Sequence, residues 1–161
     1  MNKILLLGLA ATLAVGAIVW NASGGSSSSS YSDGSLTASE TDFDFGSIPM
    51  SGGNVSYPFT LTNSSNSPVV IEKVYTSCMC TTASVSVGSA SPLGPFGMPG
   101  HTPSAASLTV PPGETVTVEA VFDPAAHGPA GVGLAERSIY LDTNSASSPK
   151  VELRFRALVT N

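Results

Sequence analysis

The residues best suited to chemistry in this chain are two cysteines in the stretch SCMCTT, Cys78 and Cys80, separated by one methionine. Two thiols at this spacing can form a disulfide, hold a metal ion or pack in a core. The chain contains two histidines, His101 and His127, and each lies in a long connection rich in glycine and proline. Met98 precedes the first of them in GMPGH. These five side chains are the candidate site residues.

The donor types favour a soft metal ion. Thiolate, thioether and imidazole groups suit copper, especially Cu(I), better than hard cations. Residues i and i+2 of an extended strand point to the same face, so Cys78 and Cys80 can share one ion at about 2.3 Å each. We therefore predict a metal site formed by Cys78, Cys80, Met98, His101 and His127. Copper is the expected ion, zinc is the alternative, and a domain without a metal stays open.

Two other interpretations of the cysteine pair remain. On an extended strand the two Cα atoms lie about 6.6–6.8 Å apart, so a Cys78–Cys80 disulfide requires a sharp bend of the backbone. A reversible bridge of this kind would make the chain a thiol redox protein, although Lys73 is the one cation near the pair in the sequence. The plainest alternative is that both cysteines are packed in the core.

Alternating apolar and polar residues predict that these side chains are positioned by β-strands. In NVSYPFTLTN, for example, Val55, Tyr57, Phe59 and Leu61 fall on one face. Further strands are expected near 42–46, 69–75, 83–87, 114–123, 137–144 and 150–160. Polar turn segments separate them, and a chain of this length can bury one sandwich core. The expected fold is all-β, an immunoglobulin-like β-sandwich of seven to eight strands with long loops at 88–105 and 124–135.

The amino terminus predicts a different kind of segment. An uncharged apolar run from Ile4 to Trp20 follows Lys3, and the next cation is Lys73. This run is just long enough to cross a bilayer, and the charge bias leaves everything after Trp20 outside the cytosol. We expect a membrane anchor or signal segment at 1–22, a disordered Ser/Gly-rich linker at 23–37 and the sandwich at 38–161. Cleavage of the apolar helix would make the domain a secreted one.

The motif order resembles that of a known bacterial family. FDFGSI is followed by the SCMCT stretch, by VPPGETVTVEAVFDP and by TN before the last strand. This order is similar to uncharacterised extracytoplasmic domains with a Ser-Cys-Gly-Cys-Thr signature, related to the immunoglobulin-like domains of Hydin and ASPM and to major sperm protein. The resemblance implies a sandwich of seven or eight strands and no established reaction. Met79 stands where that family commonly has glycine, and the 88–105 loop is an insertion.

Composition narrows the function classes. The net charge is -5, 11% of residues are charged and no basic cluster occurs, so a nucleic-acid role lacks its electrostatic basis. No nucleophile elbow or phosphate-binding glycine loop is present, so we predict no catalytic residues and no enzyme. The leading hypothesis is a membrane-tethered, single-pass extracytoplasmic module for binding or assembly, with a protein partner of unknown identity and a soft-metal site. A plain adhesion domain and a thiol redox protein are the alternatives.

Overall fold

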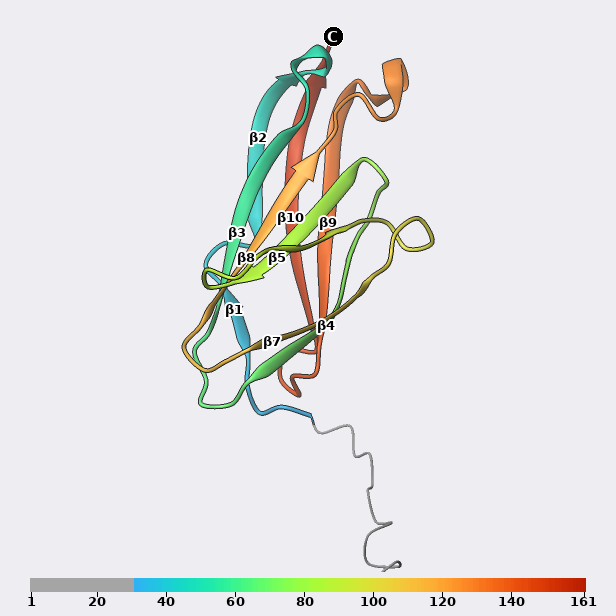
Figure 1. The fold of residues 1–161 in the computed structure, drawn as a ribbon. Coiled ribbons are helices and arrows are strands. Elements are labelled where there is room, and N and C mark those ends of the chain that lie inside the picture. Colours follow the sequence, from blue (N-terminus) through green and yellow to red (C-terminus); the bar gives the residue numbers. More distant parts are fainter. Residues whose placement is uncertain (1–30) are drawn as a thin grey trace, which may run out of the picture. The chain divides into compact units, whose positions relative to one another are not determined.

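Strands of alternating polarity dominate the computed structural model, which describes residues 31–161 (Figure 1). Within these residues two short 3-10 helices interrupt the strands. The elements are β1 (Leu36–Ala38), β2 (Asp42–Pro49), η1 (Met50–Gly52), β3 (Val55–Asn63), β4 (Val69–Thr76), β5 (Thr81–Val87), β6 (Leu93–Phe96), β7 (Ala105–Val110), β8 (Thr115–Phe122), η2 (Gly128–Gly131), β9 (Gly133–Thr143) and β10 (Lys150–Thr160).

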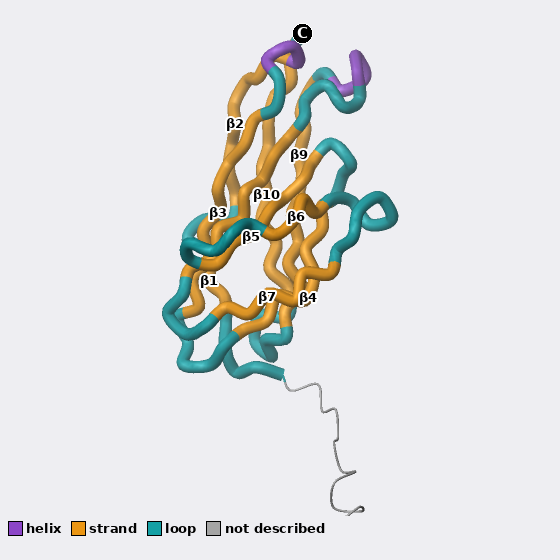
Figure 2. The backbone as a smooth tube through the Cα atoms, viewed as in Figure 1, coloured by secondary structure: helices purple, strands orange, loops and turns teal. Residues whose placement is uncertain are grey.

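The strands form two sheets of five strands each, in the orders β1-β3-β8-β5-β6 and β2-β10-β9-β4-β7. Neighbouring strands are antiparallel except β2 and β10, which run parallel. Figure 2 shows the strands as two stacked layers with the connections gathered mainly at their ends. The all-β, two-sheet sandwich predicted from the sequence is therefore confirmed.

Alternation along the strands places one face of each sheet in the core. On β8, Val116, Val118, Ala120 and Phe122 are buried, while the residues between them are partly exposed. The opposite sheet contributes buried side chains in the same way from its central strands. These are Ile71 and Val74 of β4, Ile139 and Leu141 of β9, and Leu153, Phe155, Ala157 and Val159 of β10. Burial of this apolar area provides the main stabilisation of the fold.

The strand count is higher than the sequence predicts. The segment 88–105, expected to be one long loop, contains β6 and the first residue of β7. β6 pairs with β5 in one sheet and β7 pairs with β4 in the other, so this insertion crosses between the two layers. Its residues do not alternate clearly in the sequence, and β6 has one buried residue, Phe96. Short edge strands of this kind carry little periodicity to detect.

The predicted anchor at 1–22, with its apolar helix, lies outside the described residues, as does most of the predicted linker at 23–37. Within residues 31–161 no helix is both long and apolar enough to cross a membrane. Ser32 forms an isolated bridge with Ser145, and β1 begins at Leu36.

Candidate functional site

Cys78 and Cys80 lie in the tight connection between β4 and β5. The N–H of Thr81 donates to the carbonyl oxygen of Cys78 at 3.2 Å, which closes a four-residue turn across Cys78–Thr81. The expectation that both cysteines lie on an extended strand is therefore wrong. The turn bends the backbone sharply between them, and the Cys80 N–H donates to the Cys78 Sγ at 3.4 Å. The bend that a disulfide would need is already present.

Hydrogen bonds from three neighbouring segments fix this turn. The buried hydroxyl of Thr76 contacts the carbonyl oxygens of Cys78 and Thr81, each at 3.0 Å. At the other end of the turn, the N–H of Asp123, just after β8, donates to the Cys80 carbonyl at 2.9 Å. A further pair of bonds joins Ser77 to Ser138 of β9. Both sheets therefore hold the cysteines in place.

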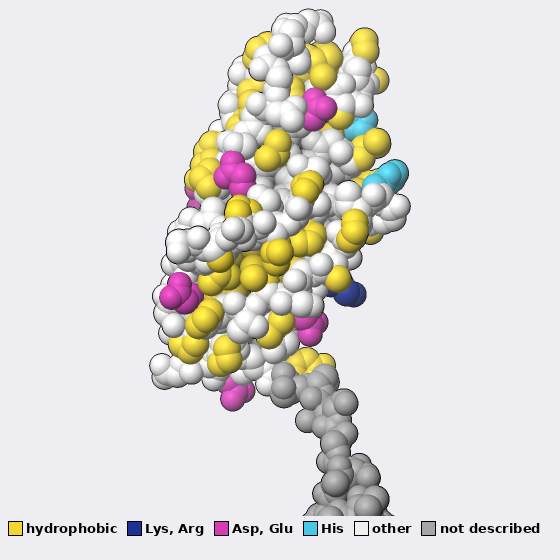
Figure 3. Space-filling view, in the orientation of Figure 1, with side chains coloured by type: hydrophobic (Ala, Val, Ile, Leu, Met, Phe, Trp, Pro, Cys, Tyr) yellow, Lys and Arg dark blue, Asp and Glu magenta, His cyan; other side chains and the backbone are white. Residues whose placement is uncertain are grey.

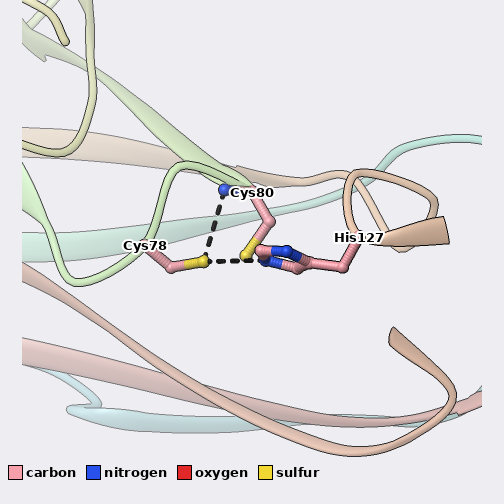
Figure 4. Close-up of side chains that lie close together, drawn as sticks. All are labelled: Cys78, Cys80 and His127. Carbon is pink, nitrogen blue, oxygen red and sulfur yellow. Dashed lines mark hydrogen bonds between the residues drawn. The ribbon is translucent and has the colours of Figure 1, made fainter. Parts of the chain in front are cut away.

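His127 reaches the cysteines from the connection between β8 and β9. Because β8 is antiparallel to β5 and Phe122 pairs with Thr81, this connection leaves the sandwich at the cysteine end. The Nε2 atom of His127 lies 3.3 Å from the Cys78 Sγ, a hydrogen bond whose direction depends on the imidazole tautomer. The donor atoms of Cys78, Cys80 and His127 all lie within 4.8 Å of one another. Figure 4 shows the three side chains converging from opposite sides.

Arg137 is a site residue that the sequence analysis missed. Arg137 lies on β9, 57 residues beyond Cys80 in the chain, and its Nε donates to the Cys80 Sγ at 3.0 Å. The sequence did contain a sign of it. Arg137 falls on the same face of the strand as the buried Ala135, Ile139 and Leu141, so alternation places it on the core side. A cation on the core-facing side of a strand requires an anionic or strongly accepting partner. Here that partner is a sulfur atom.

The two thiols have different protonation properties. Burial alone would raise the pKa of Cys78, but hydrogen bonds from Cys80 and His127 and the charge of Arg137 outweigh burial and lower this pKa to about 7. Burial raises the pKa of Cys80, as does its hydrogen bond with Cys78, although Arg137 opposes that shift. Cys78 is partly exposed, whereas Cys80 is 3% exposed. The pair thus combines an accessible thiol that ionises near neutral pH with a buried one.

The remaining predicted ligands, Met98 and His101, lie in the connection between β6 and β7. His101 is exposed and is not part of the group formed by Cys78, Cys80 and His127. Figure 3 shows the two histidine side chains as separate features on the surface. The carbonyl of Gly97 accepts the N–H of Thr76 at 3.1 Å, so the backbone next to Met98 lies beside the strand that leads into the cysteine turn. Met98 as a ligand stays a prediction.

The arrangement supports two kinds of sulfur chemistry. Three donor atoms of soft or intermediate type face one another, which suits a soft metal ion. The Sγ atoms of the same two thiols lie within 4.8 Å of each other on a bent backbone, an arrangement from which a reversible disulfide could form after a small approach. Core packing describes Cys80 but does not account for the partly exposed Cys78 or for the hydrogen bonds from His127 and Arg137.

Comparisons with known proteins place the fold more firmly than the function. Residues 36–93, 58 of the 161, match a family described as a protein of unknown function (DUF1573). No curated protein matches the chain. The match is to a family without an assigned activity. The specific Ser-Cys-Gly-Cys-Thr family, with its relation to Hydin, ASPM and major sperm protein, stays a prediction.

Among solved structures, a protein of unknown function from Porphyromonas gingivalis is similar, with a TM-score of 0.56 and 18% identity. The match covers 78% of this chain and 46% of that one, so the chain spans less than half of the length of that relative. Two others have lower scores. The VesB protease of Vibrio cholerae has a TM-score of 0.46 and 17% identity, over 80% of this chain and 32% of that one. The PapD-like domain of human CEP192 has a TM-score of 0.43 and 12% identity, and the match covers 78% of this chain and 85% of that one. The first of these similarities supports the β-sandwich fold alone.

Proposed function

We propose that this chain is an extracytoplasmic immunoglobulin-like module for binding or assembly, tethered to the membrane by its N-terminal segment, and that Cys78, Cys80 and His127 bind a soft metal ion. Copper as Cu(I) is the first candidate and zinc the second. The observation that carries the metal proposal is the convergence of three donor atoms within 4.8 Å at one end of the sandwich. The proposal includes no catalytic role and no nucleic-acid partner.

The spacing of the donors agrees with coordination geometry. Metal–sulfur and metal–nitrogen bonds of about 2.3 and 2.0 Å, at trigonal or tetrahedral angles, separate a sulfur from a nitrogen by roughly 3.5–3.7 Å. The Sγ of Cys78 and the Nε2 of His127 are 3.3 Å apart, so they need to move little to share an ion. Because Thr76 and Asp123 fix the turn, part of the ordering cost of binding is already met by folding.

The two histidines offer a matched test of this site. In titrations of the full chain with Cu(I) under anaerobic conditions, competing with a chromophoric chelator, we expect one ion per chain. His127→Asn should weaken binding by at least about 10- to 100-fold, which is the cost of losing even a group that only orients a ligand, whereas His101→Asn should bind as the unmodified protein does. Cys78→Ser and Cys80→Ser should each abolish tight binding. A protein that takes up neither Cu(I) nor Zn(II), or one in which both histidine variants behave alike, contradicts the proposal.

A thiol redox role is the second candidate, because the turn brings Cys78 and Cys80 together on a bent backbone and Cys78 is partly exposed. With a small-molecule disulfide as oxidant, the Cys78 thiolate would attack one sulfur and release a thiolate. Cys80 would then lose its proton and displace the second thiolate, forming the Cys78–Cys80 bridge. Mass spectrometry after thiol labelling distinguishes the two roles. A bridge that forms reversibly in a glutathione buffer supports the redox role, and two thiols that stay reduced exclude it.

The location is a separate part of the proposal. It is supported by the apolar run from Ile4 to Trp20 and by the distribution of cations around it. Cell fractionation with protease added to intact spheroplasts tests it. Digestion of the sandwich while cytosolic markers survive is the expected result. Protection of the sandwich until the membrane is broken would contradict the proposed orientation.

A further inference from the structure

Arg137 adds a permanent positive charge to the edge of the donor group. Its Nε contacts the Cys80 Sγ at 3.0 Å, and its Nη1 donates to the carbonyl of Glu136 at 2.7 Å. In the part of the chain that the structure describes, Arg137 forms no ion pair with a carboxylate. Besides the backbone carbonyl of Glu136, the acceptor that this guanidinium group contacts is therefore the sulfur of Cys80.

The charges of the site can be counted from these contacts. Two bound thiolates contribute two negative charges, neutral His127 contributes none, and Arg137 contributes one positive charge. The carboxylate of Asp123 accepts the N–H of Ala125 and is not part of the donor group. With both thiols deprotonated to act as ligands, the site thus carries one net negative charge apart from the ion itself. A monovalent ion neutralises it, whereas a divalent ion leaves one uncompensated positive charge beside a half-buried guanidinium, which is unfavourable.

From this balance we propose that Arg137 is a specificity-determining residue, which makes the site select Cu(I) over Zn(II). The inference rests on the proposed metal-binding function and adds the reason for the choice of ion. A thiolate ligand about 2.3 Å from the ion, with the guanidinium 3.0 Å beyond the sulfur, places Arg137 about 5 Å from the metal. One additional unit of ion charge at that distance changes affinity by roughly 200-fold in an effective dielectric of about 20.

The readout is the ratio of the Zn(II) and Cu(I) dissociation constants, measured on the full chain. Loss of Arg137 also weakens the stabilisation of both thiolates, but this lowers the two affinities together and leaves the ratio unchanged. In Arg137→Met the preference for Cu(I) should fall by about 200-fold. Arg137→Lys, which retains the charge, should keep most of the preference. Arg137→Gln replaces the Met variant if circular dichroism shows that the latter does not fold.

Lys150→Met is the charge-matched control. Lys150 forms an ion pair with Asp142, which lies on β9 five residues beyond Arg137 and about 17 Å from it along the strand. Removal of Lys150 therefore changes the net charge by the same amount but leaves the donor group untouched. Its ratio of dissociation constants should equal that of the unmodified protein. Equal ratios in the Arg137→Met and unmodified proteins would overturn this inference while leaving metal binding intact. An unmodified protein that binds neither ion would refute the proposed function itself.

Discussion

The hydroxyl group of Thr76 should determine how firmly the cysteine turn is held, and Thr76→Val tests this with little change in shape. Thr76 is 1% exposed, and its Oγ1 lies 3.0 Å from the carbonyl oxygens of both Cys78 and Thr81. Valine has nearly the same volume but no hydroxyl, so the change removes the hydrogen bond that this single O–H shares between the two carbonyl oxygens, without leaving a cavity. The Cys78 carbonyl keeps its bond from the N–H of Thr81. The loss of this shared hydrogen bond sets the size of the expected effect.

A net hydrogen bond contributes about 0.5–1.5 kcal/mol, and a carbonyl left without a partner in a buried position costs somewhat more. We therefore expect Thr76→Val to lower the free energy of unfolding by about 1–2 kcal/mol. With a denaturant slope of about 2 kcal/mol/M, the midpoint of urea unfolding should fall by roughly 0.5–1 M. The assay is urea unfolding of the metal-free protein followed by circular dichroism.

The control is Thr117→Val on β8, whose hydroxyl makes no hydrogen bond to another residue of 31–161. It should leave the midpoint nearly unchanged. The Thr76 variant should also bind Cu(I) more weakly, because a looser turn must be ordered when the ion enters. A Thr76→Val protein with the midpoint and the Cu(I) affinity of the unmodified chain would refute the conclusion that this hydroxyl organises the site.

Three further predictions concern titration and buried polar groups. In the reduced, metal-free protein, alkylation of Cys78 should reach half of its maximal rate near pH 7, and Cys80 should react far more slowly; equal rates for both thiols would contradict the assigned protonation states. A hydrogen bond from Arg154 lowers the pKa of Asp42 below its usual range. The pKa of Asp44 is also lowered, mainly by a hydrogen bond from the backbone N–H of Gly46. Their contribution to stability is therefore present above about pH 4 and is lost as the pH falls through the lowered values. Thermal unfolding between pH 2 and 7 should show less acid destabilisation in the Asp42→Asn/Asp44→Asn protein, and an unchanged pH profile would refute the assignment. Asn63 is fully buried and its side-chain amide donates to two backbone carbonyls, so Asn63→Ala should lower the free energy of unfolding by about 2–4 kcal/mol in urea; a loss below about 0.5 kcal/mol would contradict this.

The strands of the sandwich could be predicted because each has one face buried. In β3 and β8, which lie inside their sheet, alternation between core and surface is nearly complete, as at Phe59 and Leu61 or Val116 and Val118. β6 and β7 lie at sheet edges and bury fewer side chains, so periodicity gives little sign of them. Their pairing depends on contacts between residues distant in the chain, which sequence periodicity does not contain.

The candidate site came from residue type and not from periodicity. Residue type selected Cys78, Cys80 and His127, which lie together in the structure, and equally Met98 and His101. The turn between the cysteines depends on Thr76 and on the N–H of Asp123, just after β8. A local pattern could not show that bend. Arg137 was detectable, since its parity on β9 points to the core, yet its partner follows only from the way the two sheets stack.

The contact between Arg137 and Cys80 joins the two layers, because β9 belongs to one sheet and Cys80 directly precedes β5 of the other. An ion bound to the proposed donor group would therefore strengthen a link between the two sheets at the cysteine end of the sandwich. Such an ion would bind the folded chain but not the unfolded chain, so it would shift the unfolding equilibrium toward the folded state. For a domain in the proposed extracytoplasmic location, the supply of the proposed ion would then set how often the chain unfolds and becomes open to proteases.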